Sequence, residues 1–185
     1  MVNTSEFKET RLISDVGLAK AKDKEAFERL IHNNKHKLFR IAKSILKSDF
    51  DVDDSLQETI IKAWTKIDTL KDERSFSTWI TKILVNECYL IIRKRTSTLD
   101  LGNFNFETKD SSIDIDNKID VWNSLNSLND DFRLPIILYF FEDFSYEEIS
   151  LILKIPKGTV RSRISRGKEK LESILNNYSR EDKHE

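Results

Sequence analysis

Cysteine, proline, glycine and long apolar runs are all scarce in this chain of 185 residues. The single cysteine, Cys88, excludes a disulfide framework and a cysteine-rich metal site. Two prolines and four glycines are too few for the many turns of a sheet protein, so we expect a mostly helical, all-α fold. No apolar run approaches the length that spans a bilayer, and the N-terminus has no apolar signal segment. We therefore expect a soluble, cytoplasmic protein.

Histidine is scarce as well, with three in the chain. His32 and His36 are four residues apart, a helical spacing that can hold zinc, but no HExxH motif or nearby cysteine completes such a site. Two surface histidines are the simpler interpretation. We expect no metal and no cofactor.

The formal net charge of −1 is close to zero, which at first argues against a protein that binds nucleic acid. The distribution of charge answers this objection. Basic residues cluster in segment 157–170 and again at 93–95, whereas segment 99–130 is acidic. A phosphate backbone responds to the local potential, so two separated basic patches can bind nucleic acid despite a neutral total charge.

Segment 145–171, SYEEISLILKIPKGTVRSRISRGKEKL, is the most informative part of the chain. Ser145 and Glu148 have the capping-box spacing, which predicts the start of a helix. Pro156 predicts the end of that helix, and a second helix is expected to begin near Lys157. Two short helices joined by a tight turn form a helix-turn-helix, a motif that points to DNA.

The second helix of this motif is expected to have two opposite faces. On a wheel of about 100° per residue, an apolar arc contains Val160, Ile164 and Leu171. The opposite arc carries Arg161, Ser162, Ser165 and Arg166. The apolar arc can fix the helix on its neighbour, while arginine and hydroxyl groups reach base edges and phosphates in a major groove. A solvated basic helix in an ordinary bundle is the alternative.

Gly158 and Thr159, at the start of this second helix, are expected where helix and backbone must come close. The N-terminus of a helix also carries partial positive charge and free N–H groups, which favour a phosphate ligand.

Three amphipathic helices are expected in the first half of the chain, over 25–47, 52–70 and 76–95, with a short leading helix over 12–21. Apolar residues at helical spacing should form a bundle core: Phe27, Leu30, Ile31, Leu38, Ile41, Ala42, Ile45, Leu56, Ile60, Ala63, Trp64, Ile67, Leu70, Phe76, Trp79, Ile80, Ile83 and Leu84. A different face of the 52–70 helix is lined by Asp54, Gln57, Glu58 and Ile61.

Segment 96–119 has no sustained helical period and is rich in Ser, Asn and Asp, so it predicts a linker. It also contains the apolar residues Leu99, Leu101, Phe104 and Phe106, so we expect parts of it to pack on a surface, unlike a Gly/Ser tether. We therefore expect two small helical domains joined by a flexible acidic linker. The expected ranges are a lead segment 1–21, a first domain 22–95, the linker 96–119, a helix-turn-helix domain 120–178 and a polar tail 179–185.

Four segments, taken in order, resemble the signatures of a bacterial RNA polymerase sigma factor of the extracytoplasmic-function (ECF) group. They are KDKEAFERL from Lys22, DVDDSLQETIIKAW from Asp51, FSTWITKILVNECYLIIRK from Phe76, and segment 145–171. The resemblance covers about 22–95 and 120–178 and leaves the linker and both tails unmatched. The short linker favours the two-domain ECF form over the larger housekeeping type.

The resemblance implies a protein that binds core RNA polymerase and directs promoter recognition, melting and transcription initiation for a stress or envelope regulon, without bond chemistry of its own. It implies control by an anti-sigma factor, commonly a membrane-bound one. It places polymerase docking on Asp54, Gln57, Glu58 and Ile61. It places contacts to the minus 10 element on Lys71, Arg74, Trp79, Asn86, Arg93 and Lys94. It places contacts to the minus 35 element on Lys157, Thr159, Arg161, Ser162, Arg163, Ser165 and Arg166.

The residues alone leave alternatives open for these sites. The acidic face of the 52–70 helix can be solvated surface, Trp79 can be core and Asn86 a surface amide. A conventional helix-turn-helix regulator would use its first domain for dimerisation or effector binding. A metal-dependent enzyme acting on nucleic acid would use acidic residues that lack an accompanying His or phosphate-binding Gly loop, namely Asp51, Asp53, Asp54 and Glu58.

The chain departs from the family pattern at four positions. Leu90 stands where the family often has an acidic residue, and both Asp143 and Lys154 replace a common glycine. A left-handed lysine costs on the order of 1 kcal/mol relative to glycine. Pro135 falls within an expected helix, which should start late or bend.

Overall fold

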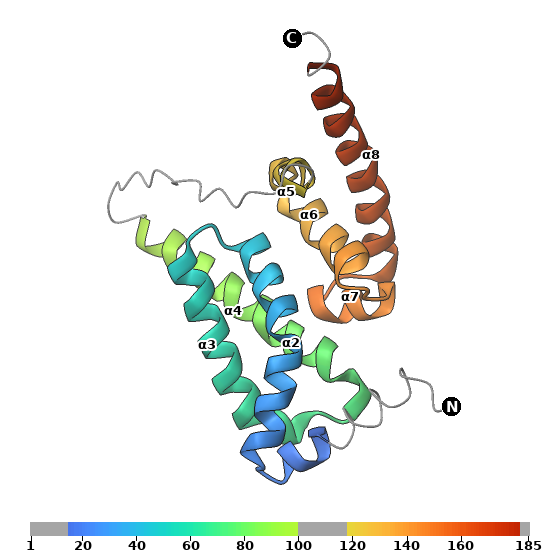
Figure 1. The fold of residues 1–185 in the computed structure, drawn as a ribbon. Helices are drawn as coiled ribbons and strands as arrows, with labels where there is room; N and C mark the ends of the chain where they lie inside the picture. The colour runs from blue at the N-terminus through green and yellow to red at the C-terminus, as the bar shows by residue number, and fades with distance from the viewer. Residues whose placement is uncertain (1–14, 100–117, 182–185) are drawn as a thin grey trace. The chain divides into compact units, whose positions relative to one another are not determined.

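The structure, a computed structural model, describes residues 15–99 and 118–181. These residues are helical or lie in short connections, and no strand occurs among them (Figure 1). They divide into two compact units, one on each side of the segment 100–117. The expected all-α fold with two helical domains is therefore confirmed. Within the described ranges, no helix is long and apolar enough to cross a membrane.

The first unit is a bundle of three helices, α2 (Lys24–Ile45), α3 (Asp49–Lys66) and α4 (Phe76–Leu99), preceded by a short helix over 15–20. All three pairs of these helices are in contact, and Figure 1 shows them side by side. Two short 3₁₀ turns, η1 (Ile67–Thr69) and η2 (Glu73–Ser75), connect α3 to α4. The three helices that the apolar periodicity predicts are thus present, with ends shifted by a few residues.

The buried face of α3 differs from the predicted apolar stripe. Two polar residues, Ser55 and Thr59, are completely buried together with Val52 and Ala63. The Ser55 hydroxyl donates to the Val52 carbonyl at 2.8 Å, and the Thr59 hydroxyl donates to the Ser55 carbonyl at 2.7 Å. Each hydroxyl is satisfied inside its own helix, so its burial carries little penalty. Ser55 also lies beside the thiol of Cys88, which places this small-residue face against α4.

Ile31, Ile60 and Trp64, which we expected in the core, are only half-buried, because they border an open groove. The groove has a volume of about 490 Å³ and runs between α2 and α3. Its apolar lining is Phe27, Ile31, Ile60 and Trp64. The Trp64 ring lies 5.0 Å from that of Phe27, and the Lys22 ammonium lies 5.5 Å from the Trp64 ring centroid.

Both ends of the segment expected to lack helix are helical. Helix α4 continues through Thr96 to Leu99, and α5 begins at Lys118. The prediction of a non-helical segment over 96–119 is therefore wrong at its ends. Its remaining residues, with Leu101, Phe104 and Phe106, lie outside the described ranges.

The second unit contains α5 (Lys118–Ser127), α6 (Asp130–Ile136), a π-helical turn η3 (Ile137–Phe141), α7 (Tyr146–Leu153) and α8 (Lys157–Glu181). The long helix α8 contacts α5, α6 and α7, and Figure 1 shows α6 and α7 beside its N-terminal half. Leu125, Leu128, Ile136 and Ile137 form a buried cluster within this unit.

Pro135 lies inside α6, which begins without delay. The Asn129 side chain accepts from the backbone N–H of Asp131 at 3.0 Å and caps the helix. Pro135 has no N–H to donate, and the winding changes to the wider π-helical turn directly after α6. The expected disturbance of this helix thus takes the form of a change in winding.

The close helix contact of the second unit occurs at Gly167, where α8 crosses α6. A Cβ atom added to Gly167 would lie 2.6 Å from Cδ1 of Ile136 and 3.1 Å from Cβ of Phe132. At Gly158, where we expected a close approach, an added Cβ would meet nothing within 4 Å. That expectation was wrong, because Gly158 lies on the exposed side of the first turn of α8.

Burial should make Cys88 unreactive in the native protein. Its side chain is fully buried, and burial raises its pKa to about 11. A pKa near 11 leaves about a hundredfold less thiolate at pH 8 than an ordinary cysteine has. We expect iodoacetamide to alkylate Cys88 at least about a hundredfold more slowly in buffer than in concentrated urea. Mass spectrometry measures the alkylation rate, and equal alkylation rates in buffer and in urea would contradict the burial of Cys88.

The contact at Gly167 predicts non-additive effects on stability. Ile136→Val removes Cδ1, the atom nearest to an added methyl. This change should cost about 1 kcal/mol of unfolding free energy in the wild-type chain. It should cost little or nothing in the Gly167→Ala chain, where the same atom would be overpacked. Urea denaturation of the four proteins measures this coupling, and strictly additive costs would argue against a close contact.

Candidate nucleic-acid interface

Helix α7 begins with the capping box that the sequence predicts. The Ser145 hydroxyl accepts from the Glu148 N–H at 3.3 Å, and a Glu148 carboxylate oxygen accepts from the Ser145 N–H at 2.9 Å. Two backbone donors at the helix start are thereby satisfied. Ile149 and Ile152 of α7 are buried, so the helix is anchored by its apolar side and fixed in position at its start.

The turn between α7 and α8 places Lys154 in the left-handed conformation. Lys154 has φ 56° and ψ 40°, and Asp143, which also replaces a common glycine, has φ 57°. The Ser150 hydroxyl donates to the carbonyl of Ile155 at 2.6 Å and closes the turn. Pro156 ends the connection, and its carbonyl accepts the first backbone hydrogen bonds of α8. The helix-turn-helix prediction is confirmed in its geometry.

Helix α8 has the two faces that the wheel predicts. Val160 and Ile164 are buried and Leu171 is half-buried. The opposite side exposes Arg161, Ser162, Ser165 and Arg166. An exposed side with two arginines and two hydroxyls can donate to base edges and phosphates.

Three further residues expected to contact the minus 35 element lie in different surroundings. Lys157 is exposed and forms an ion pair with Glu147 of α7. Thr159 is half-buried, and its carbonyl accepts from the Ser162 hydroxyl at 3.0 Å. Arg163 is half-buried and turns toward α6, where its guanidinium lies 2.8 Å from the Asp131 carboxylate.

Two tyrosines beside the helix-turn-helix were missed by sequence reasoning. The rings of Tyr139 and Tyr146 lie 4.9 Å apart. Burial and the neighbouring Tyr139 raise the pKa of Tyr146, whereas the positive charge of Arg161 acts in the opposite direction. Arg161 is therefore close to the phenol at the start of α7. No spacing rule connects these positions, because they come from three different elements.

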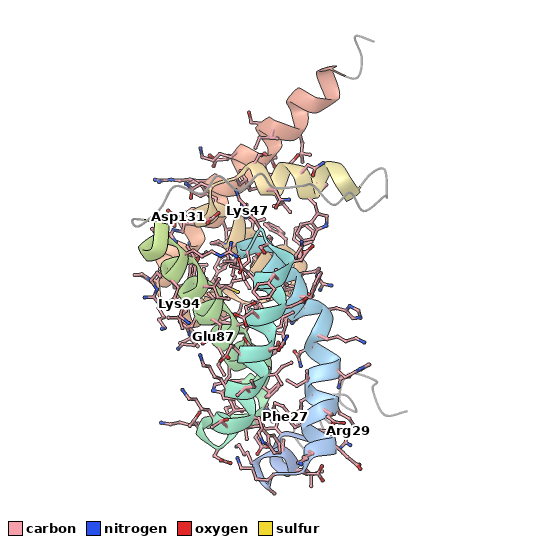
Figure 2. The ribbon with its side chains drawn as sticks, turned by 90° about the vertical axis from the view of Figure 1, so that its left-hand side faces the viewer. Phe27, Arg29, Lys47, Glu87, Lys94 and Asp131 are labelled. Carbon is pink, nitrogen blue, oxygen red and sulfur yellow. The ribbon has the colours of Figure 1, made fainter. Side chains whose placement is uncertain are left out.

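The face of α3 expected to dock on polymerase is exposed as a whole. All four residues are exposed, and Ile61 keeps 59% of its surface accessible. Glu58 pairs with Lys62 at 3.8 Å, and Lys62 also pairs with Glu87, a buried acid of α4 labelled in Figure 2. Lys62 was missed, although its spacing of four residues from Glu58 is a known pairing signal.

The four acidic residues of the enzyme alternative do not share one site. Asp51 is buried, and its carboxylate lies 2.6 Å from the Arg95 guanidinium of α4, whereas Asp53, Asp54 and Glu58 are exposed. Among the described residues, no group of three histidines, cysteines or acids could hold a metal ion. His32 and His36 are both exposed on α2.

Residues expected to contact the minus 10 element are spread along α4 and the turn before it. Lys71 and Arg74 are exposed in the connection, and Arg93 and Lys94 are exposed near the other end of α4, where Figure 2 labels Lys94. Fourteen residues of helix separate Trp79 from Arg93, a distance on the order of 20 Å. The set therefore suits an extended ligand better than a compact one.

Trp79, Asn86 and Arg93 are seven residues apart, so they lie on one side of α4. Trp79 is half-buried, with its ring 6.0 Å from that of Phe76. The half-buried Asn86 amide donates to the Lys82 carbonyl at 2.6 Å, and Arg93 donates to the Tyr89 carbonyl at 3.3 Å. This side of α4 combines an aromatic ring, an amide and a cation.

Two family models match the chain, one in each unit. The model described as Sigma-70 region 2 matches residues 30–98, and the model described as Sigma-70, region 4 matches residues 118–171. The first covers the bundle of α2, α3 and α4, and the second covers α5 to the middle of α8.

Curated relatives and solved structures agree with these matches. The ECF RNA polymerase sigma-E factors of Salmonella typhimurium and Escherichia coli are 33% identical over 167 residues, which cover 82% of this chain and 87% of each relative. The sigma factor RpoE of Bartonella quintana, solved with the anti-sigma factor NepR, superimposes with a TM-score of 0.71 at 29% identity and covers 81% of this chain and 96% of that one. CnrH, solved with the cytosolic domain of CnrY, has a similar fold, with a TM-score of 0.69 at 24% identity over 90% of this chain and 98% of that one.

The two family models and the relatives of which this chain covers 87% lead to the same assignment, with which the helix-turn-helix geometry agrees. The chain belongs to the ECF group of RNA polymerase sigma factors, which direct the polymerase to promoters and initiate transcription there.

Proposed function

We propose that this protein docks on core RNA polymerase with the exposed face of α3, holds the minus 10 element with α4 and its preceding turn, and reads the minus 35 element with α8. The observation that carries the proposal is the division of α8 into two sides. Val160 and Ile164 fix the helix on its own unit, while Arg161 and Arg166 remain exposed on the other side. This division is what a helix inserted in a major groove requires.

The exposed face of α3 supports the docking role. Asp54 and Glu58 supply carboxylates, Gln57 supplies an amide, and Ile61 supplies one apolar anchor in the middle of a polar surface. Carboxylates of this kind form strong bidentate pairs with arginines, and a partly exposed apolar residue adds area that binding removes from water.

The side of α4 that contains Trp79, Asn86 and Arg93 supports the minus 10 role. Proteins that hold a single DNA strand combine cationic groups for the phosphates with a surface on which unstacked bases rest. Lys71 and Arg74 at one end and Arg93 and Lys94 at the other provide cations along the length of α4. Trp79 packs on Phe76 and so forms a wall of this surface.

We further propose that an anti-sigma factor controls this protein, that the regulon answers stress or envelope signals, and that the protein acts in the cytoplasm as a non-catalytic subunit. Two similar solved structures contain an anti-sigma factor or the cytosolic domain of a partner protein. An anti-sigma factor that covers the α3 face or the exposed side of α8 would block the contacts proposed above.

The central test combines purified core RNA polymerase, this protein and a promoter library. We expect promoter-directed transcripts only when both proteins are present. Charge reversal of Asp54 and Glu58 to lysine should weaken core binding at least about tenfold, which is ~1.4 kcal/mol. Glu28→Lys, at an exposed glutamate of α2, is the matched control and should leave core binding unchanged.

Two results would overturn the proposal. One is an absence of both core association and promoter-directed transcript. The other is tight, selective binding of intact duplex by the protein alone in a gel shift, because that is the behaviour of a conventional helix-turn-helix regulator.

Arg166→Ala should weaken selection of the minus 35 element by about 1 to 3 kcal/mol, because a bidentate contact to a base edge would be lost. Competition between promoters with intact and altered minus 35 elements measures this selection. Lys168→Ala is the matched control, since Lys168 is also exposed on α8 and pairs with Glu172 of the same helix at 3.5 Å. Unchanged selection in Arg166→Ala would remove Arg166 from base reading.

A further inference from the structure

We propose that the ion pair between Arg163 and Asp131 sets the orientation of α8 for promoter reading, so that Arg163 is a positioning residue and not a DNA contact. The inference rests on the proposed role of α8 at the minus 35 element. Arg163 lies between the exposed Arg161 and Arg166 in sequence but has different surroundings in the fold.

The guanidinium of Arg163 is directed toward α6. Its Nη2 atom lies 2.8 Å from Oδ1 of Asp131, and 28% of the Arg163 side chain is exposed. The Asp131 side chain, labelled in Figure 2, is 61% exposed, so the pair lies at the rim of the α6–α8 contact. A charge-assisted hydrogen bond has a preferred direction, which apolar contacts lack.

The backbone of Asp131 is held in place at the start of α6. The Asn129 side chain caps α6 by accepting from the Asp131 N–H at 3.0 Å. The neighbouring acid, Asp130, pairs with Arg133 of its own helix. The first turn of α6 therefore contains two adjacent acids: Asp130 pairs within its own helix, and Asp131 pairs with α8.

Three residues on one side of α8 contact α6. Arg163 pairs with Asp131, Gly167 packs against Phe132 and Ile136, and the Lys170 ammonium lies 5.4 Å from the Phe132 ring centroid. The spacing of four and then three residues places these positions on one side of α8. The contact at Gly167 fixes how closely the helices approach, and the ion pair resists rotation of α8 about its axis.

Rotation of α8 is the motion to which base reading is most sensitive. The guanidinium groups of Arg161 and Arg166 project far from the helix axis, so a small rotation moves them by a large fraction of a hydrogen-bond length. Recognition groups must be held within about 0.5 Å and 10–20° of their working geometry. Val160 and Ile164 hold α8 on its unit by apolar burial, which has no preferred direction, so the ion pair adds a directional restraint.

An Arg163 that contacts a phosphate would behave differently when Asp131 is changed. Removing the acid would then free Arg163 for DNA and would raise affinity. If the pair positions α8, removing the acid instead lowers the selection of minus 35 sequences. Asp131→Asn therefore distinguishes the two roles, and this exposed position tolerates the change without loss of the fold.

The test uses holoenzyme reconstituted with full-length protein carrying Asp131→Asn, Arg163→Gln, both changes, or the control Glu172→Gln. Glu172 is an exposed acid that pairs with the exposed Lys168 of its own helix. Competition between promoters with intact and altered minus 35 elements gives a selectivity ratio at several salt concentrations. We expect each single variant to lose about threefold to tenfold in this ratio and the double variant to lose no more than either. The control should match the wild type, and selection at the minus 10 element should not change.

The salt dependence provides a second readout. The slope of log affinity against log salt should be the same for wild type and Arg163→Gln, because no phosphate contact is lost. A slope reduced by about one in Arg163→Gln, together with tighter binding by Asp131→Asn, would overturn the proposal. An unchanged selectivity ratio in Asp131→Asn would overturn it as well. Failure of the wild-type holoenzyme to initiate at any promoter would instead refute the proposed function, so the two failures are distinct.

Discussion

Close helix packing at small side chains is the constraint on which both units depend. In the first unit, Ser55 and Thr59 give α3 a narrow buried side, and in the second, Gly167 brings α8 against α6. Because small residues make these contacts, the helices need only one side for packing. The opposite side is then available for charged and polar groups, so α3 exposes an acidic face and α8 exposes arginines without weakening either core.

Two buried acids form ion pairs between α3, the helix proposed to dock on the polymerase, and α4, the helix proposed to bind the promoter strand. Glu87 of α4 pairs with Lys62 of α3, and Asp51 of α3 pairs with Arg95 of α4. Each acid is buried, so loss of its cation would leave an uncompensated charge in the interior. The two pairs cross the α3–α4 interface in opposite directions and fix the register of the helices.

Local signals predicted most of the fold, and contacts between distant elements account for the errors. The capping box at Ser145 and the helix end at Pro156 depend only on residues close in sequence, so both could be predicted. The buried side of α3 was not, because Ser55 counts as polar until its hydroxyl is seen to bond inside its own helix. The close contact at Gly167 and the pairing of Arg163 depend on what α6 places opposite them, which a helical wheel cannot show.

The interior position of Cys88 has a consequence for how signals can reach this protein. The chain has a single cysteine, and its thiol is enclosed by the first bundle and held in the protonated form. Oxidants act on exposed thiolates, so Cys88 is shielded from them while the first bundle is folded. An oxidant could reach Cys88 only after a local opening of the bundle of α2, α3 and α4 had exposed its thiol.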